Sequence, residues 1–372
     1  MKILYDGHVY RMQPIGGINR YLINIVNRLP DDWTPVITIG NTKQLEYRQL
    51  RFPVHQNLVL KRSPTPRLCP KKLLAWTSRR FFAGIESAGD FSLIHSVHHV
   101  SLASPRHVRR RAPFVVTVHD MIPQIFGQEM DPEGNDTEIK RRSVESADAV
   151  ICVSNNTRKD LLEHIRISED RVFVTHLASE LSRGISFGDE PVPDHPYFLF
   201  VGMRKSAHKN FARLLKAFSL VAEKWAELCL CVAGPAFDPS ESKLIAELRI
   251  DDRVSNINSV TDAHLAKLYR CSLALVCPSL YEGFGFPPLE AMACGSLAVV
   301  SNTSSLPEVA GESAFKVSPY SVESIADGMS RVLNLGTDQR REVIVDGLAW
   351  ASRFDWNKTV KATISVYESL AS

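Results

Sequence analysis

The stretch that decides the fold is Glu282-Gly283-Phe284-Gly285-Phe286-Pro287-Pro288-Leu289-Glu290. An apolar run, Leu273–Cys277, precedes it and is typical of a buried strand. Proline is tolerated in the first turn of a helix, so Pro287-Pro288 predicts a helix that continues over residues 288–294. The stretch therefore joins a strand to a helix through a glycine turn, with a carboxylate on each side of the turn.

The turn and its two carboxylates, Glu282 and Glu290, suit a particular kind of ligand. A glycine turn at a helix N-terminus offers backbone N–H groups and the positive end of the helix dipole to an anion. Carboxylates accept hydrogen bonds from hydroxyl groups. Phosphate and hydroxyls together describe a nucleotide sugar. Taken alone, these residues also allow a structural role, with Glu282 as a helix cap and Glu290 as a solvated helix residue.

The composition is that of a soluble globular protein with two domains. The chain has 372 residues, of which 44% are hydrophobic and 23% charged, and its formal net charge is +3. No apolar run is long enough to span a membrane, and residues 1–7 are predicted to form a strand rather than a signal peptide, so we expect a cytoplasmic protein.

The absence of CxxC pairs argues against a disulfide framework or a zinc site. Five cysteines lie in apolar runs and are expected to be small buried hydrophobes: Cys152, Cys229, Cys231, Cys271 and Cys277.

Strand-like runs alternate with helical patterns along most of the chain, which predicts two parallel α/β sheets. We expect one Rossmann-like domain over residues 1–180 and a second over residues 197–354. Residues 181–196 are rich in proline and polar residues and are predicted to be a linker. Residues 355–372 show an amphipathic pattern and are expected to form a final helix that packs on the N-terminal domain. The predicted strands cover residues 3–5, 36–39, 93–97, 114–118, 149–153, 172–175, 197–201, 228–233, 254–257, 273–277 and 297–300.

Three further motifs follow predicted strands, where open parallel sheets bind their ligands. Gly16-Gly17 precedes the first long helix, and its glycines permit close approach of an anion or a sugar. His119 can exchange hydrogen bonds with a substrate hydroxyl, the alternative being a capping or core histidine. Arg204 and Lys209 bracket a loop without an acidic neighbour in the sequence, which favours diphosphate binding over a solvated basic loop.

The segment Arg48–Arg80 is strongly basic, because no acidic residue lies between Glu46 and Glu86. Aromatic residues such as Trp76 are interleaved with its nine basic residues. This pattern predicts either an interfacial surface for an anionic membrane or a solvated basic loop and helix. No recognised nucleic-acid-binding module accompanies the charge, so nucleic acid is not expected as a partner.

A series of motifs runs along the chain in a fixed order: Gly16-Gly17, Val118-His119-Asp120, Val153-Ser154 with residues 157–161, Val201-Gly202 with Arg204, Lys209-Asn210, residues 278–295, and residues 305–308. In order and spacing, the chain resembles the retaining glycosyltransferases of glycosyltransferase family four, which are glycogen-synthase-like and use nucleotide sugars. The resemblance covers nearly the whole chain, and its most specific part is the segment around the two glutamates.

The resemblance implies an α/β protein of the GT-B fold, with two Rossmann-like parallel-sheet domains facing across a cleft. Arg204 and Lys209 would bind the donor diphosphate, while Glu282 and His119 would contact the transferred sugar. Many relatives have arginine immediately before the lysine. Here that residue is His208, so Arg204 is expected to supply the guanidinium. The residues expected to hold the nucleotide sugar beyond these are Gly16, Gly17, Phe284, Gly285, Phe286, Leu289 and, on the ribose, Glu290.

We therefore expect transfer of a hexose, with GDP-mannose as the donor of choice, to a saccharide or lipid-linked saccharide in surface-glycan synthesis. UDP-sugars or dTDP-rhamnose as donors, and a non-catalytic nucleotide-sugar-binding protein, are the alternatives. No Asp-x-Asp motif stands in a plausible place, so we expect retention without a metal and no cofactor beside the donor. A dehydrogenase is not expected, because no GxGxxG follows the first strand. The segment Arg48–Arg80 would bring the protein to the inner face of the membrane.

Overall fold

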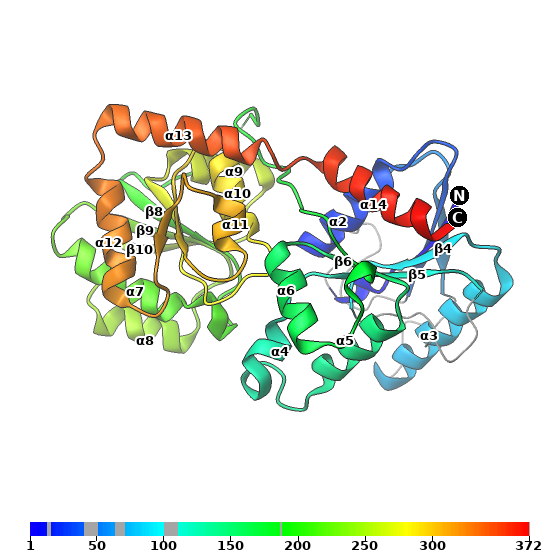
Figure 1. Cartoon of the computed structure of the whole chain (residues 1–372). Helices are drawn as coiled ribbons and strands as arrows, with labels where there is room; N and C mark the ends of the chain where they lie inside the picture. Colours follow the sequence, from blue (N-terminus) through cyan, green and yellow to red (C-terminus); the bar gives the residue numbers. More distant parts are fainter. Residues whose placement is uncertain (13–15, 41–50, 64–70, 100–110, 187, 372) are drawn as a thin grey trace. The chain divides into compact units, whose positions relative to one another are not determined.

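The structure, a computed structural model, describes residues 1–12, 16–40, 51–63, 71–99, 111–186 and 188–371 (Figure 1). The chain folds into two compact units. The first unit comprises Met1–Leu177 and Trp356–Ser372, and the second comprises Ala178–Asp355. The chain thus leaves the first unit once and returns to it with its last helix.

The first unit is built on a parallel sheet in which seven strands are described, in the order β3-β2-β1-β4-β5-β6-β7. The order reverses between β1 and β4, which lie side by side with Tyr5 opposite His95. The strands are β1 (Lys2–Asp6), β2 (Thr34–Ile39), β3 (Val59–Arg62), β4 (Leu93–Ser96), β5 (Phe114–Val118), β6 (Ala149–Cys152) and β7 (Val172–Val174). The helices are α1 (Val9–Met12), α2 (Gly17–Asn27), α3 (Lys71–Ala88), α4 (Ile122–Phe126), α5 (Asn135–Ser146), α6 (Asn155–His164) and α14 (Trp356–Ala371).

The second unit contains a six-stranded parallel sheet in the order β10-β9-β8-β11-β12-β13. Its core is made of large apolar side chains that include Phe198, Phe218 and Met329. The strands are β8 (Tyr197–Val201), β9 (Cys229–Ala233), β10 (Val254–Ile257), β11 (Ala274–Cys277), β12 (Ala298–Ser301) and β13 (Phe315–Val317). The helices are η4 (Ala207–Lys209), α7 (Phe211–Ala222), α8 (Pro239–Glu247), α9 (Asp262–Cys271), α10 (Phe286–Ala293), α11 (Leu306–Ala310), α12 (Val322–Leu333) and α13 (Thr337–Ala351).

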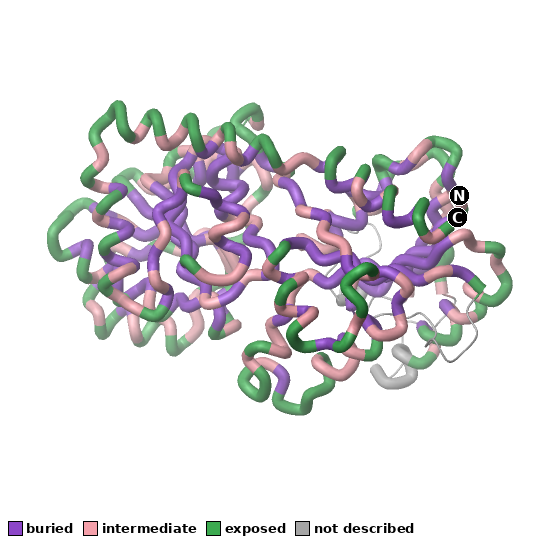
Figure 2. Tube along the Cα trace, in the orientation of Figure 1, coloured by how far each residue is buried: buried purple, intermediate pink, exposed green. Residues whose placement is uncertain are grey.

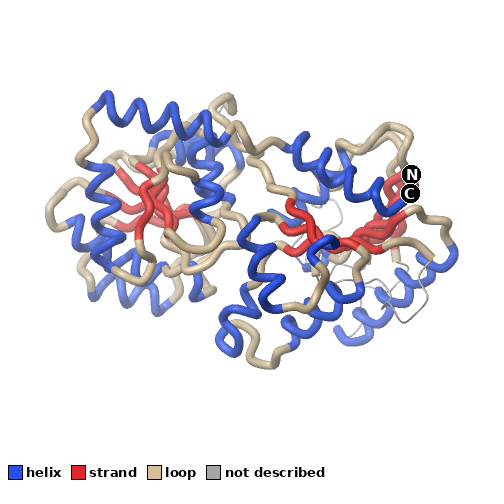
Figure 3. Tube along the Cα trace, in the orientation of Figure 1, coloured by secondary structure: helices blue, strands red, loops and turns tan. Residues whose placement is uncertain are grey.

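Within each unit the strands lie between layers of helices (Figure 3). The sheets are buried and the outer faces of the helices are exposed, as Figure 2 shows. This explains why the central strands read as continuous apolar runs, since both faces of a parallel sheet are covered. Every residue of β5, β6, β11 and β12 is buried.

The predicted α/β fold of two parallel-sheet domains is confirmed, and the predicted strands begin and end within two residues of the observed ones. Two strands were not predicted. The edge strand β3 ends in the exposed pair Lys61-Arg62, and β13 has only three residues, so neither shows an apolar run. The prediction that Cys271 is buried is wrong, because it is the exposed last residue of α9.

The final helix, α14, belongs to the first unit and contributes to its polar interior. Its Tyr367 hydroxyl lies 2.6 Å from His95 Nδ1 and 3.3 Å from the Tyr5 hydroxyl. Residues 181–196, expected to be a linker, lie in the second unit, and those that are described form no helix or strand. In the described part of the chain, no helix is long and apolar enough to cross a bilayer.

Candidate functional site

The strand order of the second unit reverses between β8 and β11, which are paired with Leu275 opposite Leu199. Chain connections leave the two strands in opposite directions across the sheet, so their loops diverge and leave room for a ligand at their carboxyl ends. The loop after β8 carries Arg204 and Lys209, and the loop after β11 carries Glu282. The topology therefore places two predicted site motifs on neighbouring strands.

Lys209 and Glu282 form an ion pair at this edge of the sheet. The Lys209 Nζ lies 2.6 Å from Glu282 Oε1, and the two side chains are 21% and 12% exposed. The Ser279 hydroxyl donates a second hydrogen bond to the same carboxylate oxygen, at 2.7 Å. A partly exposed ammonium and a carboxylate are thus held together at the end of β8 and β11.

The glycine turn after Glu282 is braced from the loop between β12 and α11. Glu282 N donates to the Ser304 hydroxyl at 3.0 Å. The fully buried Ser305 hydroxyl lies 2.8 Å from the carbonyl oxygen of Glu282 and 2.7 Å from that of Phe284. Because these carbonyls are satisfied from one side, the conformation of the turn is fixed before any ligand arrives.

Gly285 connects this turn to α10 and cannot be replaced without strain. Its φ is +109°, in the region that disfavours L side chains. A Cβ at this position would also come within 2.9 Å of Leu306 Cδ2. Gly285 is the N-cap of α10 and no side chain caps this helix, so the alternative of Glu282 as its cap is wrong.

Glu290 lies on α10 and is buried, with 7% of its surface exposed, so the alternative of a solvated helix residue is wrong as well. The Tyr269 hydroxyl, from α9, donates to Glu290 Oε2 at 3.0 Å. Tyr269 is not among the residues that the sequence analysis selected. No local signal marks this contact, because it joins two helices that are separated by β11.

Asn210 ties three loops of the site together. It has φ +59°, a conformation that asparagine tolerates better than most residues, and it precedes α7 directly. Its side-chain amide donates to the carbonyl oxygens of Pro278 at 2.9 Å and Pro319 at 2.7 Å. The loops after β8, β11 and β13 are therefore fastened to one residue next to Lys209.

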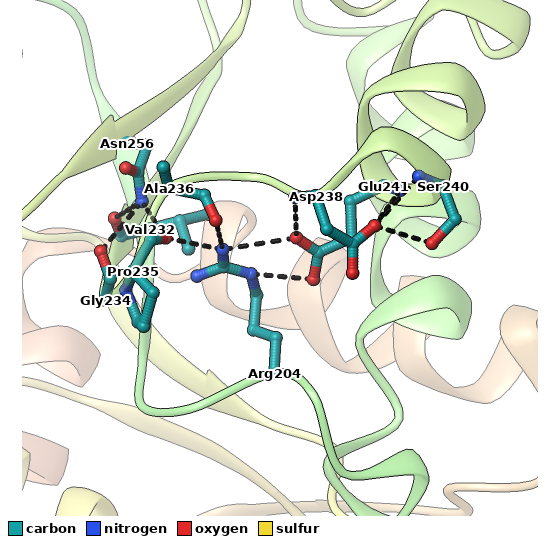
Figure 4. Close-up of polar contacts among 9 residues, drawn as sticks. All are labelled: Arg204, Val232, Gly234, Pro235, Ala236, Asp238, Ser240, Glu241 and Asn256. Atoms are coloured by element: carbon teal, nitrogen blue, oxygen red, sulfur yellow. Dashed lines mark hydrogen bonds and ion pairs between the residues drawn. The ribbon is translucent and has the colours of Figure 1, made fainter.

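Arg204 has an acidic neighbour in space, although no acidic residue is close to it in the sequence. Its Nε lies 2.9 Å from Glu241 Oε1, and the two side chains are only 3% and 13% exposed. Its Nη2 donates to the carbonyl oxygens of Pro235 and Ala236 (Figure 4). Its guanidinium also lies 5.0 Å from the ring centre of Phe237. The guanidinium thus holds the loop between β9 and α8 in place, and its Nε and Nη2 N–H groups point into the protein.

The same loop is braced on its other side. The Asn256 amide, from β10, donates to the carbonyl oxygens of Val232, Gly234 and Pro235 (Figure 4). Asp238 caps α8, and its backbone N–H is in turn bound by Glu241 Oε2 at 3.0 Å. Glu241 therefore belongs to a capping box and to the ion pair with Arg204, which was not visible in the sequence because 37 residues separate the pair.

In the first unit, His119 follows β5 as predicted and is held by its ring. Its Nε2 lies 2.8 Å from the carbonyl oxygen of Val97, which can only accept, so Nε2 carries the proton. Burial lowers the pKa of His119. The hydrogen bond to Val97 and the negative charge of Asp120 act to raise this pKa, but burial outweighs them. The imidazole is therefore neutral at physiological pH, and its Nδ1 is a hydrogen-bond acceptor.

The residue after His119, Asp120, forms an ion pair with a buried lysine that could not be predicted from the sequence. Lys140 is fully buried on α5, and its Nζ donates to the Asp120 carbonyl oxygen at 2.8 Å and to Oδ1 at 3.3 Å. Burial would raise the pKa of the Asp120 carboxyl, but Lys140 and the Ile122 N–H outweigh it and hold this pKa below its ordinary value. Lys140 lies in a highly charged helix, where nothing in the sequence marks it as buried.

The two glycines predicted to precede the first long helix lie at its start. Gly16 is the N-cap of α2, which begins at Gly17 and has no side-chain cap. Residues 13–15 before them lie outside the described residues, as do parts of the segment Arg48–Arg80. Among the described residues, no cluster of three or more His, Cys, Asp or Glu side chains could hold a metal ion.

Two family matches cover most of the chain. Residues 15–183 match "Glycosyltransferase Family 4", and residues 184–347 match "Glycosyl transferases group 1".

The similar proteins of known name include several mannosyltransferases. The O-antigen chain mannosyltransferase B of Escherichia coli is 27% identical over the full length of both chains. The serotype-specific mannosyltransferase WbdA of Escherichia coli is 29% identical over 69% of this chain, which spans only 33% of WbdA. The MMP alpha-(1->4)-mannosyltransferase of Mycolicibacterium hassiacum is 27% identical, with 80% of this chain and 74% of that protein covered.

Two solved structures superpose on nearly the whole chain. Sucrose-phosphate synthase from Thermosynechococcus elongatus superposes with a TM-score of 0.80 at 19% identity, covering 100% of this chain and 99% of the other. Anabaena HepE, in complex with UDP and glucose, superposes with a TM-score of 0.76 at 17% identity, covering both chains fully. At these identities the likeness establishes the GT-B fold.

Proposed function

This chain is a glycosyltransferase of the family-four type, and we propose that it transfers a mannosyl group from GDP-mannose to a saccharide or lipid-linked saccharide acceptor during synthesis of a surface glycan. The observation that carries the proposal is the Lys209–Glu282 pair at the topological switch of the second sheet. The names of the similar mannosyltransferases support the choice of sugar.

Lys209 is assigned to the donor diphosphate. Transfer from a nucleotide sugar develops negative charge on the departing diphosphate, so a preorganised cation close to it lowers the barrier. The Lys209 ammonium is held by Glu282, and the Lys209 side chain remains 21% exposed, so that a ligand can approach it. The N–H groups at the start of α10 would add to this stabilisation. Arg204 is reassigned to a structural role, because Glu241 and two backbone carbonyls already bind its guanidinium.

The carboxylates are assigned to hydroxyl groups. Glu282 would accept from hydroxyls of the transferred sugar, and Glu290 from the ribose. In the first unit, the Nδ1 of the neutral His119 would accept a hydrogen bond from a sugar hydroxyl. Neither glutamate is assigned as a general base. The proposed reaction proceeds with retention and without a metal, with the acceptor hydroxyl attacking on the face that the diphosphate leaves.

A binding screen followed by a transfer assay tests this proposal. The thermal unfolding temperature is measured with GDP, UDP and dTDP and their sugars, because a ligand at a hundred times its Kd stabilises the native state by about 2.7 kcal/mol. Release of GDP from GDP-mannose that depends on a saccharide acceptor would support the proposal. Stabilisation by UDP or dTDP alone would overturn the choice of donor. Binding without turnover, with every acceptor tried, would favour a non-catalytic nucleotide-sugar-binding protein.

We also propose that the basic helix α3 contacts an anionic membrane and so brings the enzyme to a lipid-linked acceptor. Trp76 on this helix is 54% exposed, and the Arg80 guanidinium lies 4.8 Å from its ring centre. An exposed tryptophan beside cationic side chains is suited to the interface between lipid headgroups and water.

A further inference from the structure

The contact between Tyr269 and Glu290 joins two side chains that are both withdrawn from water. Tyr269 is fully buried on α9, and Glu290 is 7% exposed on α10, which packs against α9. The phenol hydroxyl donates to Glu290 Oε2 at 3.0 Å. A carboxylate that is nearly buried needs hydrogen-bond donors to offset the loss of hydration. Tyr269 supplies one from a helix that carries none of the predicted donor-binding residues.

The phenol keeps its proton under all physiological conditions. Burial raises the pKa of Tyr269 well above its ordinary value, and the neighbouring Glu290 raises it further. The hydroxyl is therefore a permanent donor to Glu290. The position of the hydroxyl is fixed as well, because the Tyr269 ring is fully buried and is enclosed by other side chains.

A hydrogen bond to one oxygen also controls the direction of the other. The terminal torsion of a glutamate is broad, so a carboxylate with no anchor samples many planes. With Oε2 held by Tyr269, the plane of the carboxylate is set and with it the direction of Oε1. Recognition of a ribose by its neighbouring hydroxyls depends on that plane, and a group held in its bound geometry loses less entropy on binding.

We propose that Tyr269 is a positioning residue that orients the Glu290 carboxylate toward the ribose of the nucleotide donor. The inference rests on the proposed function, in which Glu290 binds that ribose. Tyr269 itself touches no substrate. It acts on affinity for the nucleotide, through Glu290, and leaves the chemical step unchanged.

The chain offers a closely matched control. Tyr197 is also buried, and its hydroxyl donates to the carbonyl oxygen of Leu268 on the same helix α9, at 2.8 Å. Tyr197→Phe and Tyr269→Phe each delete one buried phenol hydroxyl and one hydrogen bond to a protein acceptor. Only Tyr269→Phe removes a bond to Glu290, so a general loss of stability affects both variants and a loss of positioning affects one.

The experiment measures the Kd of GDP, UDP and dTDP for the wild type and both variants by calorimetry. For the nucleotide that binds, the Kd of the corresponding 2′,3′-dideoxynucleoside diphosphate, which has no ribose hydroxyls, is measured as well. Tyr269→Phe is expected to weaken binding of the natural nucleotide about five- to tenfold, the size of one hydrogen bond. Tyr197→Phe should bind like the wild type. With the hydroxyl-free nucleotide, Tyr269→Phe and the wild type should have equal Kd values, and in turnover KM should rise while kcat stays constant.

Three results would overturn the inference, and they are distinguishable. Equal binding of the natural nucleotide by Tyr269→Phe and the wild type would show that Glu290 needs no orienting bond. An equal loss with the hydroxyl-free nucleotide would show that the effect does not pass through the ribose. If the wild type binds no nucleoside diphosphate at all, the proposed function falls and the inference falls with it.

Discussion

Lys209 and Glu282 are separated by 73 residues in the chain, yet the Lys209 Nζ lies 2.6 Å from Glu282 Oε1. The contact exists because β8 and β11 are neighbours in the sheet although two strands intervene in sequence. Each side chain compensates the charge of the other at the edge where the strand order reverses. The residue predicted to bind phosphate and the residue predicted to bind the sugar are thus in direct contact in the second unit.

Replacing Lys209 with alanine is expected to lower kcat by roughly 10²–10³, the typical cost of losing one group that stabilises developing negative charge. The matched control is Lys205→Ala, in the same loop, because Lys205 is exposed. Steady-state rates with the identified donor, with circular dichroism to verify folding, provide the measurement. A fully active Lys209→Ala enzyme would place the diphosphate elsewhere.

Replacing Arg204 with alanine is expected to act on stability. The change leaves Glu241 nearly buried without its cation, which should lower the free energy of unfolding by about 2–4 kcal/mol. Lys243→Ala is the control, since its pair with Glu247 on the same helix is 78% and 58% exposed and is expected to contribute less than about 1 kcal/mol. Denaturant unfolding measures both. A stable Arg204→Ala protein with greatly reduced kcat would restore Arg204 to the diphosphate.

Transfer should continue in the presence of EDTA. The proposed charge stabilisation comes from Lys209 and backbone N–H groups, so removal of divalent cations is expected to leave kcat within about twofold. The assay compares enzyme treated with EDTA before and after addition of Mg²⁺ or Mn²⁺. A rate that collapses with EDTA and recovers with either cation would contradict the proposed mechanism.

Stability of the first unit should fall as the solution is acidified. Burial and, to a smaller extent, the nearby His119 lower the pKa of His95 to about 3. The folded state therefore keeps His95 neutral where the unfolded chain, with a pKa of about 6.5, binds a proton. The contribution of His95 to stability is expected to be constant above pH 6.5 and to fall by up to about 1.4 kcal/mol per pH unit between pH 6.5 and 3.

The His95→Gln variant tests the assignment of that pH dependence. Thermal unfolding at several pH values should show a shallower slope for this variant, because glutamine does not titrate. Parallel slopes for the variant and the wild type below pH 6.5 would show that other groups cause the acid sensitivity.

Neutralising the exposed arginines of α3 should weaken binding to anionic vesicles. Each basic residue near such a surface contributes about 1 kcal/mol, so Arg79→Gln with Arg80→Gln is expected to reduce the partition coefficient on the order of 30-fold. Arg341→Gln, at an exposed position of the second unit, is the control. Flotation with phosphatidylserine vesicles measures the partition, and absence of the wild type from the floating fraction would reject membrane contact.

The sequence was sufficient for the fold because buried parallel strands are uninterrupted apolar runs, as in β5 and β11. Lys209, Glu282 and Glu290 could be chosen as candidate site residues from the sequence, since each follows a strand or a glycine turn. The contact between Arg204 and Glu241 could not be predicted, because Glu241 lies on a helix beyond the next strand. Contacts of this kind depend on packing between distant elements.

Tyr269 and Lys140 are two further residues whose contacts could not be predicted from the sequence. Both are fully buried polar residues, and each lies in a segment whose sequence has an ordinary helical pattern. Burial of a tyrosine hydroxyl or a lysine ammonium is decided by which carboxylate the fold brings to it. Only the assembled structure shows that these carboxylates are Glu290 and Asp120.

The return of α14 to the first unit has a consequence for how the protein is made on the ribosome. The second unit, Ala178–Asp355, is an insertion between the two parts of the first. At about 5–20 residues per second, this insertion takes roughly 10–40 s to synthesise. Throughout that interval the nascent first unit lacks Tyr367. The hydrogen bonds of the Tyr367 hydroxyl with His95 and Tyr5 therefore form only after the last helix has been synthesised. The second unit, which is continuous in the chain, can complete its fold first.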